Sequence, residues 1–372
     1  MRAAARLLIL VVSICAAACA GAKPADLAQL TLPAGFHIAV YARDVPNARE
    51  LALGANGAVF AGSRTAGKVY AMIDADHDGR AEKVVVVADD LDTPSGIAFH
   101  DGDLYIGAIS RIYRLRAIES HLDAPPKPEL VTDKLPTDTS HGWKSIAFGP
   151  DGRLYVPIGA PCNICDPGTT HAKMISMKPD GSDWQDVAFG IRNSVGFDWQ
   201  PSTKELWFTD NGRDMLGDDL PSDELNRITR AGEHFGFPYC HQGDTLDAEF
   251  GKGKSCSDYT PPVQKLGAHV AALGMRFYTG TMFPAEYQGA AIIAQHGSWN
   301  RTVKSGYRVM SVRLDGNRVV SYEPLIKGFE RHDDVIGRPS DVLVMPDGAL
   351  LVADDFGGAV YRVTYAASAA KP

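Results

Sequence analysis

Short apolar segments separated by polar turns recur along the whole chain. Six copies of one pattern, an apolar run, a polar turn and a second apolar run, begin at Leu51, Ile97, Ile146, Val195, Met275 and Val342. Three of the turns contain the Asp-Gly pair that tight hairpins require. No stretch with the length and period of a helix lies between the runs, so the pattern predicts strands throughout.

The spacing of the copies predicts how the strands are assembled. The first four copies start roughly 46–49 residues apart, which matches the 40–50-residue unit of a propeller blade. Six four-stranded sheets around an axis leave only short exposed edges. We therefore predict an all-β, six-bladed β-propeller as a single domain over residues 23–366, followed by a tail at 367–372. The early strand Phe36–Tyr41 is expected to complete the last blade and close the ring.

Two later spacings are longer and indicate insertions. The excess lies at about Asn211–Pro262 and in the segment Asn300–Gly337. Insertions in repeat folds map to loops on one face, which is often the binding face. We expect both segments to contribute to a ligand site.

The composition excludes two classes of partner. The 372 residues include 45 acidic and 37 basic residues, giving a net charge of -8, with no cluster of Lys and Arg. This argues against nucleic acid and against an anionic membrane surface as partners. Beyond the first residues, no apolar stretch is long enough for a transmembrane helix.

The first 22 residues have the pattern of a signal peptide. Arg2 and Arg6 precede the apolar run Leu7–Cys15, which is too short to span a bilayer, and small residues follow. Cys19, preceded by alanines, also resembles a lipobox cysteine that would be lipidated. The mature protein is expected to be exported to a periplasm, either soluble or tethered there as a lipoprotein.

Export determines how the cysteines are interpreted. Beyond the leader the chain has Cys162, Cys165, Cys240 and Cys256. In an oxidising compartment this favours two local disulfides, Cys162–Cys165 and Cys240–Cys256. The alternatives are a redox-active Cys-x-x-Cys pair and a zinc site made of all four cysteines.

An acidic turn has the spacing of half a calcium loop. Its candidate ligands are Asp74, Asp76, Asp78, the Arg80 carbonyl and Glu82. Gly79 permits the sharp turn, but Val85 stands where an EF-hand needs its bidentate glutamate. The turn is either a compact structural calcium site or a solvated acidic turn.

Polar residues stand at the ends of the predicted strands, where loops meet the propeller axis. His141 precedes the third copy, and a neutral imidazole there could accept a hydroxyl proton, although a lone histidine is more often a packing residue. Arg192 and Asn193 enter the fourth copy and offer a charged fork and a neutral amide, or a salt bridge between blades.

The same rim carries both oxygens and cations. The run Asn211-Gly212-Arg213, with Asp223 beyond it, is rich in the oxygen ligands of a hard cation. Four cationic side chains are expected to converge there: Arg192, Arg301, Lys304 and Arg338. In a net acidic protein, this predicts a small polyanionic ligand on the axis.

Several phrases together resemble one known family. GIRNSVGFDW, LWFTDNGRD, DELNRITRAG, HFGFPYC, HGSWNR and GRPSDVLVMPDG are similar, in order and over nearly the whole chain after the leader, to the glucose/sorbosone dehydrogenase family. The L-sorbosone dehydrogenase-like branch is the most similar. The resemblance implies a six-bladed propeller that binds pyrroloquinoline quinone and Ca²⁺ at its rim.

The resemblance also implies residue roles. His141 matches the general base, and Arg192 with Asn193 matches the pair at the reacting quinone carbonyl. Gly212 and Arg213 match the residues whose carbonyls hold the cofactor calcium. The remaining matches are Asn211 just before them, Asp223 in the acid-rich run behind the ion, Lys304 or Arg301 on the quinone carboxylates, and Arg338 as the following arginine.

This sequence departs from the soluble glucose dehydrogenases at one expected quinone contact and at the expected sugar contacts. Ser340 stands where the soluble glucose dehydrogenases have a second arginine, and Ala160-Pro161 stands where they have an Asp-Gln pair that reaches the sugar. The cofactor contacts are therefore expected to survive better than the glucose contacts.

These observations predict a quinone-dependent oxidoreductase that oxidises an aldose, alcohol or sorbosone-like aldehyde by hydride transfer, with an electron acceptor that the sequence does not name. The alternatives are a calcium-dependent lactonase-type propeller hydrolase and a non-catalytic propeller that binds a glycan or a partner.

Overall fold

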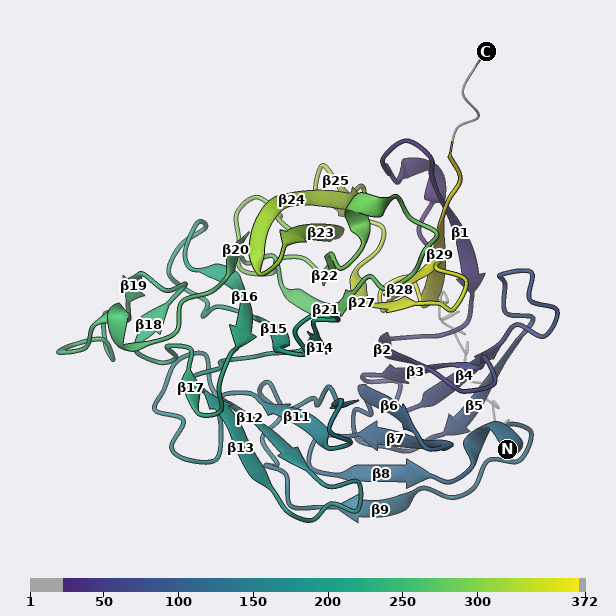
Figure 1. The fold of residues 1–372 in the computed structure, drawn as a ribbon, viewed down its shortest axis with the longest axis horizontal. Coiled ribbons are helices and arrows are strands. Elements are labelled where there is room, and N and C mark those ends of the chain that lie inside the picture. Colours follow the sequence, from purple (N-terminus) through teal and green to yellow (C-terminus); the bar gives the residue numbers. More distant parts are fainter. Residues whose placement is uncertain (1–22, 368–372) are drawn as a thin grey trace, which may run out of the picture.

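Six sheets are arranged around a central axis in the computed structural model, which describes residues 23–367 (Figure 1). Each sheet is a blade of four antiparallel strands, and blade 3 has a fifth strand, which is parallel. The innermost strands of most neighbouring blades contact one another around the axis. The prediction of an all-β, six-bladed propeller is confirmed.

The blades are numbered from the first complete sheet. Blade 1 contains β2 (Ala48–Leu53), β3 (Val59–Ser63), β4 (Val69–Ile73) and β5 (Lys83–Ala88). Blade 2 contains β6 (Gly96–His100), β7 (Asp103–Gly107), β8 (Ile112–Leu115) and β9 (Glu129–Thr132). Blade 3 contains β10 (Ala147–Phe148), β11 (Leu154–Ile158), β12 (Lys173–Met177), β13 (Gln185–Phe189) and β17 (Glu233–His234).

The second half of the ring continues in the same way. Blade 4 contains β14 (Phe197–Trp199), β15 (Leu206–Asp210), β16 (Ser222–Ile228) and β20 (Gln264–Ala268). Blade 5 contains β21 (Ala272–Phe277), β22 (Ala291–Gln295), β23 (Arg308–Asp315) and β24 (Arg318–Ile326). Blade 6 contains β27 (Pro339–Val344), β28 (Leu350–Asp354), β29 (Ala359–Tyr365) and β1 (Phe36–Ala42).

Small elements complete the described chain. Two short hairpins are β18 (Cys240–His241) with β19 (Thr245–Leu246) and β25 (Glu330–Arg331) with β26 (Asp334–Val335). The described helices are single 3₁₀ turns: η1 (Leu27–Gln29), η2 (Ile118–Ser120), η3 (Cys256–Asp258) and η4 (Ala285–Tyr287). No helix of the described chain is long and apolar enough to cross a membrane.

The ring is closed by the first strand pairing with the last. β1 pairs antiparallel with β29, with Phe36 opposite Tyr365 and Val40 opposite Tyr361. Phe36 packs edge-on against Phe283 of blade 5, with ring centroids 4.8 Å apart, so the closing strand also packs against the neighbouring blade. The predicted closure by the segment at Phe36–Tyr41 is confirmed.

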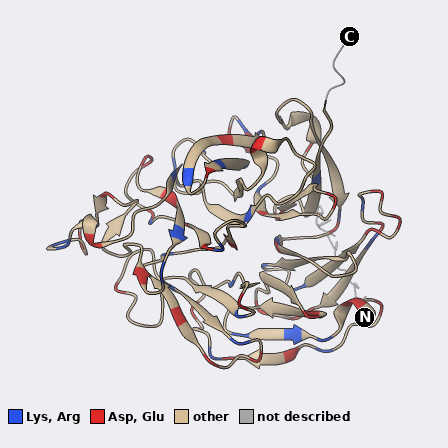
Figure 2. Ribbon diagram, viewed as in Figure 1, with Lys and Arg blue, Asp and Glu red and all other residues tan. Residues whose placement is uncertain are grey.

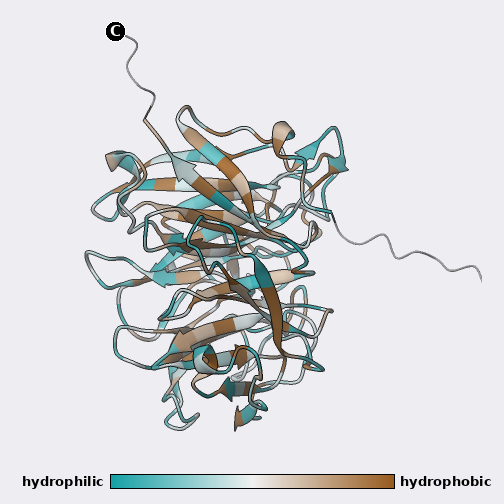
Figure 3. Cartoon of the chain, turned by 90° about the vertical axis from the view of Figure 1, so that its right-hand side faces the viewer, coloured by the Kyte–Doolittle hydropathy of each residue, from teal (hydrophilic) through white to brown (hydrophobic). Residues whose placement is uncertain are grey.

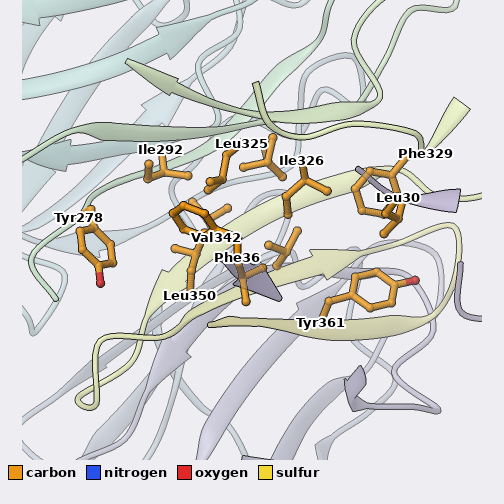
Figure 4. Packing of buried hydrophobic residues seen from close by; sticks show 14 of the residues in the cluster. Leu30, Phe36, Tyr278, Ile292, Leu325, Ile326, Phe329, Val342, Leu350 and Tyr361 are labelled. Carbon is orange, nitrogen blue, oxygen red and sulfur yellow. The ribbon is translucent and has the colours of Figure 1, made fainter. Parts of the chain in front are cut away.

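Apolar clusters fill the gap between every pair of neighbouring blades. Blades 5 and 6 enclose the largest cluster, which includes Ile292, Leu325, Val342 and Leu350 (Figure 4). Similar clusters lie between the other five pairs of blades. Many strands carry brown segments in the side view, and teal segments are common in the loops (Figure 3).

The two long segments are only partly insertions. The segment at Asn211–Pro262 contains the blade strand β16, and its excess consists of β17, which extends blade 3, and the β18–β19 hairpin, which projects at the left of Figure 1. The segment at Asn300–Gly337 contains blade strands β23 and β24, and its excess includes the β25–β26 hairpin.

Charges of both signs are spread over the loops of all the blades (Figure 2). The predicted leader at 1–22, its Cys19 and all but the first residue of the predicted tail lie outside the described residues.

Candidate functional site

The loops between inner strands form a cavity at the axis. Its volume is about 330 Å³, at the lower end of the range of small-molecule pockets. The lining residues come from blades 1, 3, 4, 5 and 6 and the loops beside them: Arg49, Arg64, His141, Trp143, Arg192, Asn193, Asn211, Gly212, Asp214, Asp223, His269, Ala271, Leu273, His296, Gly297, Ser298, Trp299 and Arg338. A site shared by five blades is fixed by the ring, not by any single loop.

His141 stands at the wall of this cavity as a neutral imidazole. Its Nδ1 lies 2.8 Å from the carbonyl oxygen of Ala160, which can accept a hydrogen bond only from a protonated Nδ1. Burial, together with the charge of Arg192, lowers the pKa of His141 to about 4. The proton on Nδ1 leaves Nε2 as the free acceptor. The backbone has φ +48°, and a Cβ on Gly159 would come within 2.6 Å of the His141 Cβ.

Arg192 and Asn193 are oriented through their backbone by one carboxylate. Asp210, at the end of β15, accepts the N–H of Arg192 at 2.9 Å and that of Asn193 at 2.6 Å. Burial raises the pKa of Asp210 to about 7. The Arg192 side chain is 4% exposed and its Nη1 donates to the carbonyl of Asn211 at 3.1 Å. The two predicted residues therefore lie side by side in the cavity.

The predicted oxygen ligands of a cation lie beside Arg192. Asp223 accepts the N–H of Gly212 at 2.9 Å and that of Ala271 at 2.7 Å, and burial raises its pKa to about 6. Asn211 uses its amide nitrogen on the carbonyls of Asn193 and Ala272, while its buried Oδ1 has no hydrogen-bond partner within the described structure. An unpaired buried oxygen that faces a cavity can coordinate a metal ion or accept a hydrogen bond from a ligand.

Arg213 is held at the edge of this oxygen cluster. Its side chain does not line the cavity; it pairs with Asp247, which also accepts from His241 at 2.9 Å. The β18–β19 insertion therefore supports the Gly212-Arg213 segment, whose carbonyls are the predicted metal ligands.

Three arginines line the blade 6 and blade 1 side of the cavity. Arg338 donates to the carbonyls of His296 and Gly297, at 3.1 and 2.8 Å, and has no carboxylate partner among the described residues. Arg64 lies over the ring of Trp143 at 4.6 Å, and its Nε is buried without a partner in the described chain. Burial, together with the neighbouring Arg49 and Arg338, lowers the pKa of Arg64.

The carboxylate of Asp355 partly neutralises the positive charge of these three arginines. It pairs with Arg49 at 2.8 Å and with His296 at 2.8 Å. Burial lowers the pKa of His296 to about 4, so the imidazole is neutral near pH 7. Among the described residues, Asp355 is the one carboxylate that forms an ion pair with any of these three arginines, which leaves this wall with excess positive charge, the environment of an anion-binding site.

Two of the four predicted cations do not reach the cavity. Arg301 bonds the carbonyl of Asp218 and pairs with the carboxylate of Asp219 at 3.1 Å, and Lys304 pairs with Asp333 at 3.0 Å. Both are satisfied by loop carboxylates and neither lines the cavity. The structure therefore brings Arg192 and Arg338 to the cavity and places Arg301 and Lys304 outside its lining.

Sequence reasoning missed several lining residues, among them Arg49, Arg64, Trp143 and His269. A signal for Arg64 was present, because it directly follows β3, the second strand of its blade, as Asn211 directly follows β15. The repeat alignment therefore places both at the same rim position. His296 directly follows β22 in the same way.

The structure shows the surroundings of Ser340 and Ala160, the two positions that depart from the family pattern. Ser340 donates to the carbonyl of Ala48 at 2.7 Å and lines a small separate pocket, not the main cavity. Ala160 contributes only its backbone, accepting from His141 and donating to the carbonyl of Arg192 at 2.7 Å. Neither position presents a polar side chain to a sugar.

Both predicted disulfides are formed. Cys162 and Cys165 are bridged with Cα atoms 6.1 Å apart, and Cys240 and Cys256 with Cα atoms 5.4 Å apart. This confirms the local pairing and excludes the zinc site, since a bridged sulfur is not a thiolate ligand.

The acidic turn between β4 and β5 gathers its carboxylates. The oxygens of Asp74, Asp76, Asp78 and Glu82 lie within 4.8 Å of one another. Oδ1 of Asp74 is buried without a hydrogen-bond partner in the described chain. Arg80 lies in the same turn, and Gly79 has φ +89°, as the sharp turn requires. The arrangement can hold a hard cation.

Comparison with known proteins gives one family and one fold. The family model described as Glucose / Sorbosone dehydrogenase matches residues 107–362. An uncharacterized protein of Borreliella burgdorferi is 35% identical over 352 residues, covering 90% of this chain and 91% of that protein.

Solved structures share the fold at low identity. A calcium structure of a Trichoderma reesei carbohydrate-active enzyme of family AA12 has a TM-score of 0.81 at 18% identity, covering 92% of this chain and 98% of that one. The holo form of the pyranose dehydrogenase PQQ domain from Coprinopsis cinerea has a TM-score of 0.78 at 18% identity, covering 93% and 99%.

Proposed function

This chain belongs to the glucose/sorbosone dehydrogenase family, and from this premise we propose that it is a quinoprotein oxidoreductase. The proposed cofactors are pyrroloquinoline quinone and Ca²⁺, and the proposed reaction is the oxidation of an aldose, alcohol or aldehyde. The observation that carries the proposal is a single axial cavity in which a neutral histidine faces the same space as a wall of arginines.

The residues present fit the quinone. Its three carboxylates need cations that are not already neutralised, and Arg64 and Arg338 have no carboxylate partner among the described residues. Arg192 and Asn193 would contact the reacting carbonyl. Ca²⁺ would take the Gly212 and Arg213 carbonyls, with the unpaired Asn211 Oδ1 as a further oxygen.

The chemistry of the chain's own residues is proton transfer and charge stabilisation. When bound, pyrroloquinoline quinone would accept a hydride from the substrate carbon. His141 would accept the hydroxyl proton at Nε2, because Nδ1 is occupied by the Ala160 carbonyl. Arg192 would stabilise negative charge that develops in the cavity.

The substrate class follows from what the cavity offers. An aldehyde would react as its hydrate, whose hydroxyl supplies the proton that His141 accepts. Trp143 and Trp299 line the cavity, and Trp299 is 71% exposed, so apolar faces are available to a ring or chain. The positions of Ala160 and Ser340 add no sugar-specific hydrogen bonds at the cavity, which supports a substrate other than glucose.

We also propose that the protein is exported to a periplasm, where it is either soluble or tethered by a lipid on Cys19. Two disulfides in the described chain support an oxidising compartment. The natural electron acceptor would then be a partner in that compartment.

A lactonase-type hydrolase remains the alternative to be tested, because Asn193, Asn211, Asp214 and Asp223 line one side of the cavity. Such an enzyme would need calcium alone, and the excess of arginines on the other side would have no role in it. A glycan-binding propeller would likewise not require the neutral His141 beside Arg192.

The proposal is tested by a dye-reduction assay with purified apoprotein and a panel of aldoses, alcohols and aldehydes. We expect turnover only when quinone and Ca²⁺ are both added. Hydrolysis of a sugar lactone with Ca²⁺ alone, and no dye reduction with any substrate of the panel, would favour the lactonase instead.

A further inference from the structure

A four-residue loop closed by a disulfide touches the buried Arg192. The Cys162–Cys165 bridge leaves only Asn163 and Ile164 between its ends. Cys162 and Ile164 pack on one side against a small cluster of Ala160, Ala172 and Phe237. This packing and the bridge together restrict the conformations open to Asn163.

Asn163 uses both its backbone and its side chain on Arg192. Its carbonyl oxygen accepts the Arg192 Nε–H at 2.9 Å, and its Oδ1 accepts from Nη2 at 2.8 Å. The same Oδ1 accepts the N–H of Asp214 at 2.7 Å, and Nδ2 donates to the Asp214 carbonyl at 3.1 Å. The amide is therefore fixed in orientation by partners on two loops.

The five guanidinium N–H groups of Arg192 can be assigned. Two donate to Asn163, one to the Asn211 carbonyl at 3.1 Å, and one reaches Asp214 Oδ2 at a long 3.4 Å. One N–H on Nη1 is left for a ligand in the cavity that Arg192 lines. Asn163 makes the two shorter contacts of this set.

Asn163 is an uncharged partner, so it does not neutralise the positive charge of Arg192. A carboxylate at the same position would neutralise the guanidinium, whereas an amide and a carbonyl fix its direction and leave its charge available. Burial lowers the pKa of Arg192, whereas the carboxylate of Asp214, 3.4 Å away, and those of Asp210 and Asp223 raise it and support the charge.

We propose that Asn163, held by the Cys162–Cys165 disulfide, is the positioning residue for Arg192. It fixes the guanidinium so that its charge and its free N–H face the ligand. The inference rests on the proposed function for what that ligand is, but the contact itself exists without any ligand.

The first test needs no quinone. In ¹⁵N–¹H spectra of the apoprotein, the Arg192 Nη2–H signals are identified by their loss in Arg192→Ala. We expect their hydrogen exchange to be at least about tenfold faster in Asn163→Ala, because that variant removes the Oδ1 that accepts from Nη2, whereas the Nε–H keeps its backbone carbonyl. The matched control is Asn317→Ala, another half-buried asparagine, whose amide lies 3.4 Å from Glu205 in another blade.

The second test measures function in a double-mutant cycle. Asn163→Ala is expected to weaken quinone binding or turnover at least about tenfold, with binding followed by tryptophan fluorescence. In an Arg192→Ala background the same change should have no further effect. The Cys162→Ala/Cys165→Ala variant should shift both readouts in the same direction, and it replaces Asn163→Ala if that variant does not fold.

Two results would overturn the inference: unchanged exchange at Arg192 in both variants, or an Asn163→Ala effect that is equally large without Arg192. Failure of the proposed function looks different, since wild-type protein would then bind no quinone while the exchange result still decides the role of Asn163.

Discussion

Among single residues, His141 and its protonation matter most for the proposed chemistry. Its φ of +48° is a conformation that non-glycine residues seldom adopt, and such positions are frequent at functional sites. The Ala160 carbonyl fixes which nitrogen carries the proton, and Arg192 disfavours a second one.

The pH dependence of turnover should report this histidine. With a pKa of about 4, His141 is the neutral base throughout the range above that value and becomes protonated below it. We therefore expect the part of kcat/KM that depends on His141 to fall as the pH drops through about 4, measured with initial-rate assays on reconstituted protein.

His141→Gln should remove this behaviour together with most of the rate. Loss of a positioned base typically costs roughly 10²–10⁴-fold, while the quinone contacts lie on other blades and should persist. Circular dichroism at each pH controls for acid unfolding. Near-wild-type turnover in His141→Gln would refute the proposed base.

Arg64 should behave as a ligand-binding residue that does not stabilise the apoprotein. It is half-buried, its Nε is unpaired in the described structure, and Arg49 and Arg338 repel it. Arg64→Ala is expected to weaken quinone binding roughly 10–100-fold, as for a lost charge-assisted hydrogen bond, and to leave the melting temperature of the apoprotein unchanged or higher.

Lys304→Ala is the informative control for Arg64. The family resemblance implies a quinone contact for Lys304, whereas the structure pairs it with Asp333 outside the cavity. Quinone affinity should therefore be unchanged in Lys304→Ala. A larger loss from Lys304→Ala than from Arg64→Ala would show that the cation wall is assigned to the wrong residues.

At the scale of elements, the turn between β4 and β5 is a candidate for calcium-dependent stability. Binding to the folded state raises stability by mass action. We expect Ca²⁺ to raise the melting temperature of the apoprotein, and the rise to be smaller in Asp76→Asn/Asp78→Asn, measured by differential scanning calorimetry.

The neighbouring exposed pair supplies the control for that turn. Asp89→Asn/Asp90→Asn removes the same two charges beyond the end of β5. An equal calcium effect in both double variants would leave the axial site as the source of the stabilisation and would reject the turn as a calcium site.

Closure of the ring by β1 should dominate the energetics of blade 6. Phe36 is 8% exposed and contacts the rings of Phe283, Tyr287 and Tyr365, at 4.8, 5.2 and 5.0 Å. Phe36→Ala should lower the free energy of unfolding by about 3–5 kcal/mol, as other large core truncations do, in a urea titration.

Leu130→Ala is the corresponding strand control, because Leu130 on the outer strand β9 is 54% exposed. Its effect should be about 0.5 kcal/mol or less. A loss below about 1 kcal/mol for Phe36→Ala would mean that the closing strand contributes little to stability.

At the scale of the whole molecule, the repeat pattern was sufficient for the fold. Each apolar run is buried on both sides between neighbouring blades, so the apolar–turn–apolar pattern directly reflects packing. The start of each copy also located the rim, which is why His141, Arg192 and Asn193 were found.

The parts that were not predicted depend on how side chains compete for partners. Arg301 and Lys304 occupy rim loops, yet nearby aspartates bind them before they reach the cavity. Arg64 reaches it because no described carboxylate pairs with it and Trp143 supports its guanidinium. Such choices depend on distances across blades, which spacing along one sequence does not contain.

The proposed oxidoreductase is tested most directly by a single-turnover experiment. Apoprotein loaded with quinone and Ca²⁺, without an electron acceptor, is mixed with each aldose, alcohol and aldehyde of the panel while the quinone absorbance is followed. We predict that at least one substrate reduces one equivalent of quinone per protein, and that His141→Gln slows this step by roughly 10²-fold or more. Bound quinone that no substrate reduces, or equally fast reduction in His141→Gln, would contradict the account.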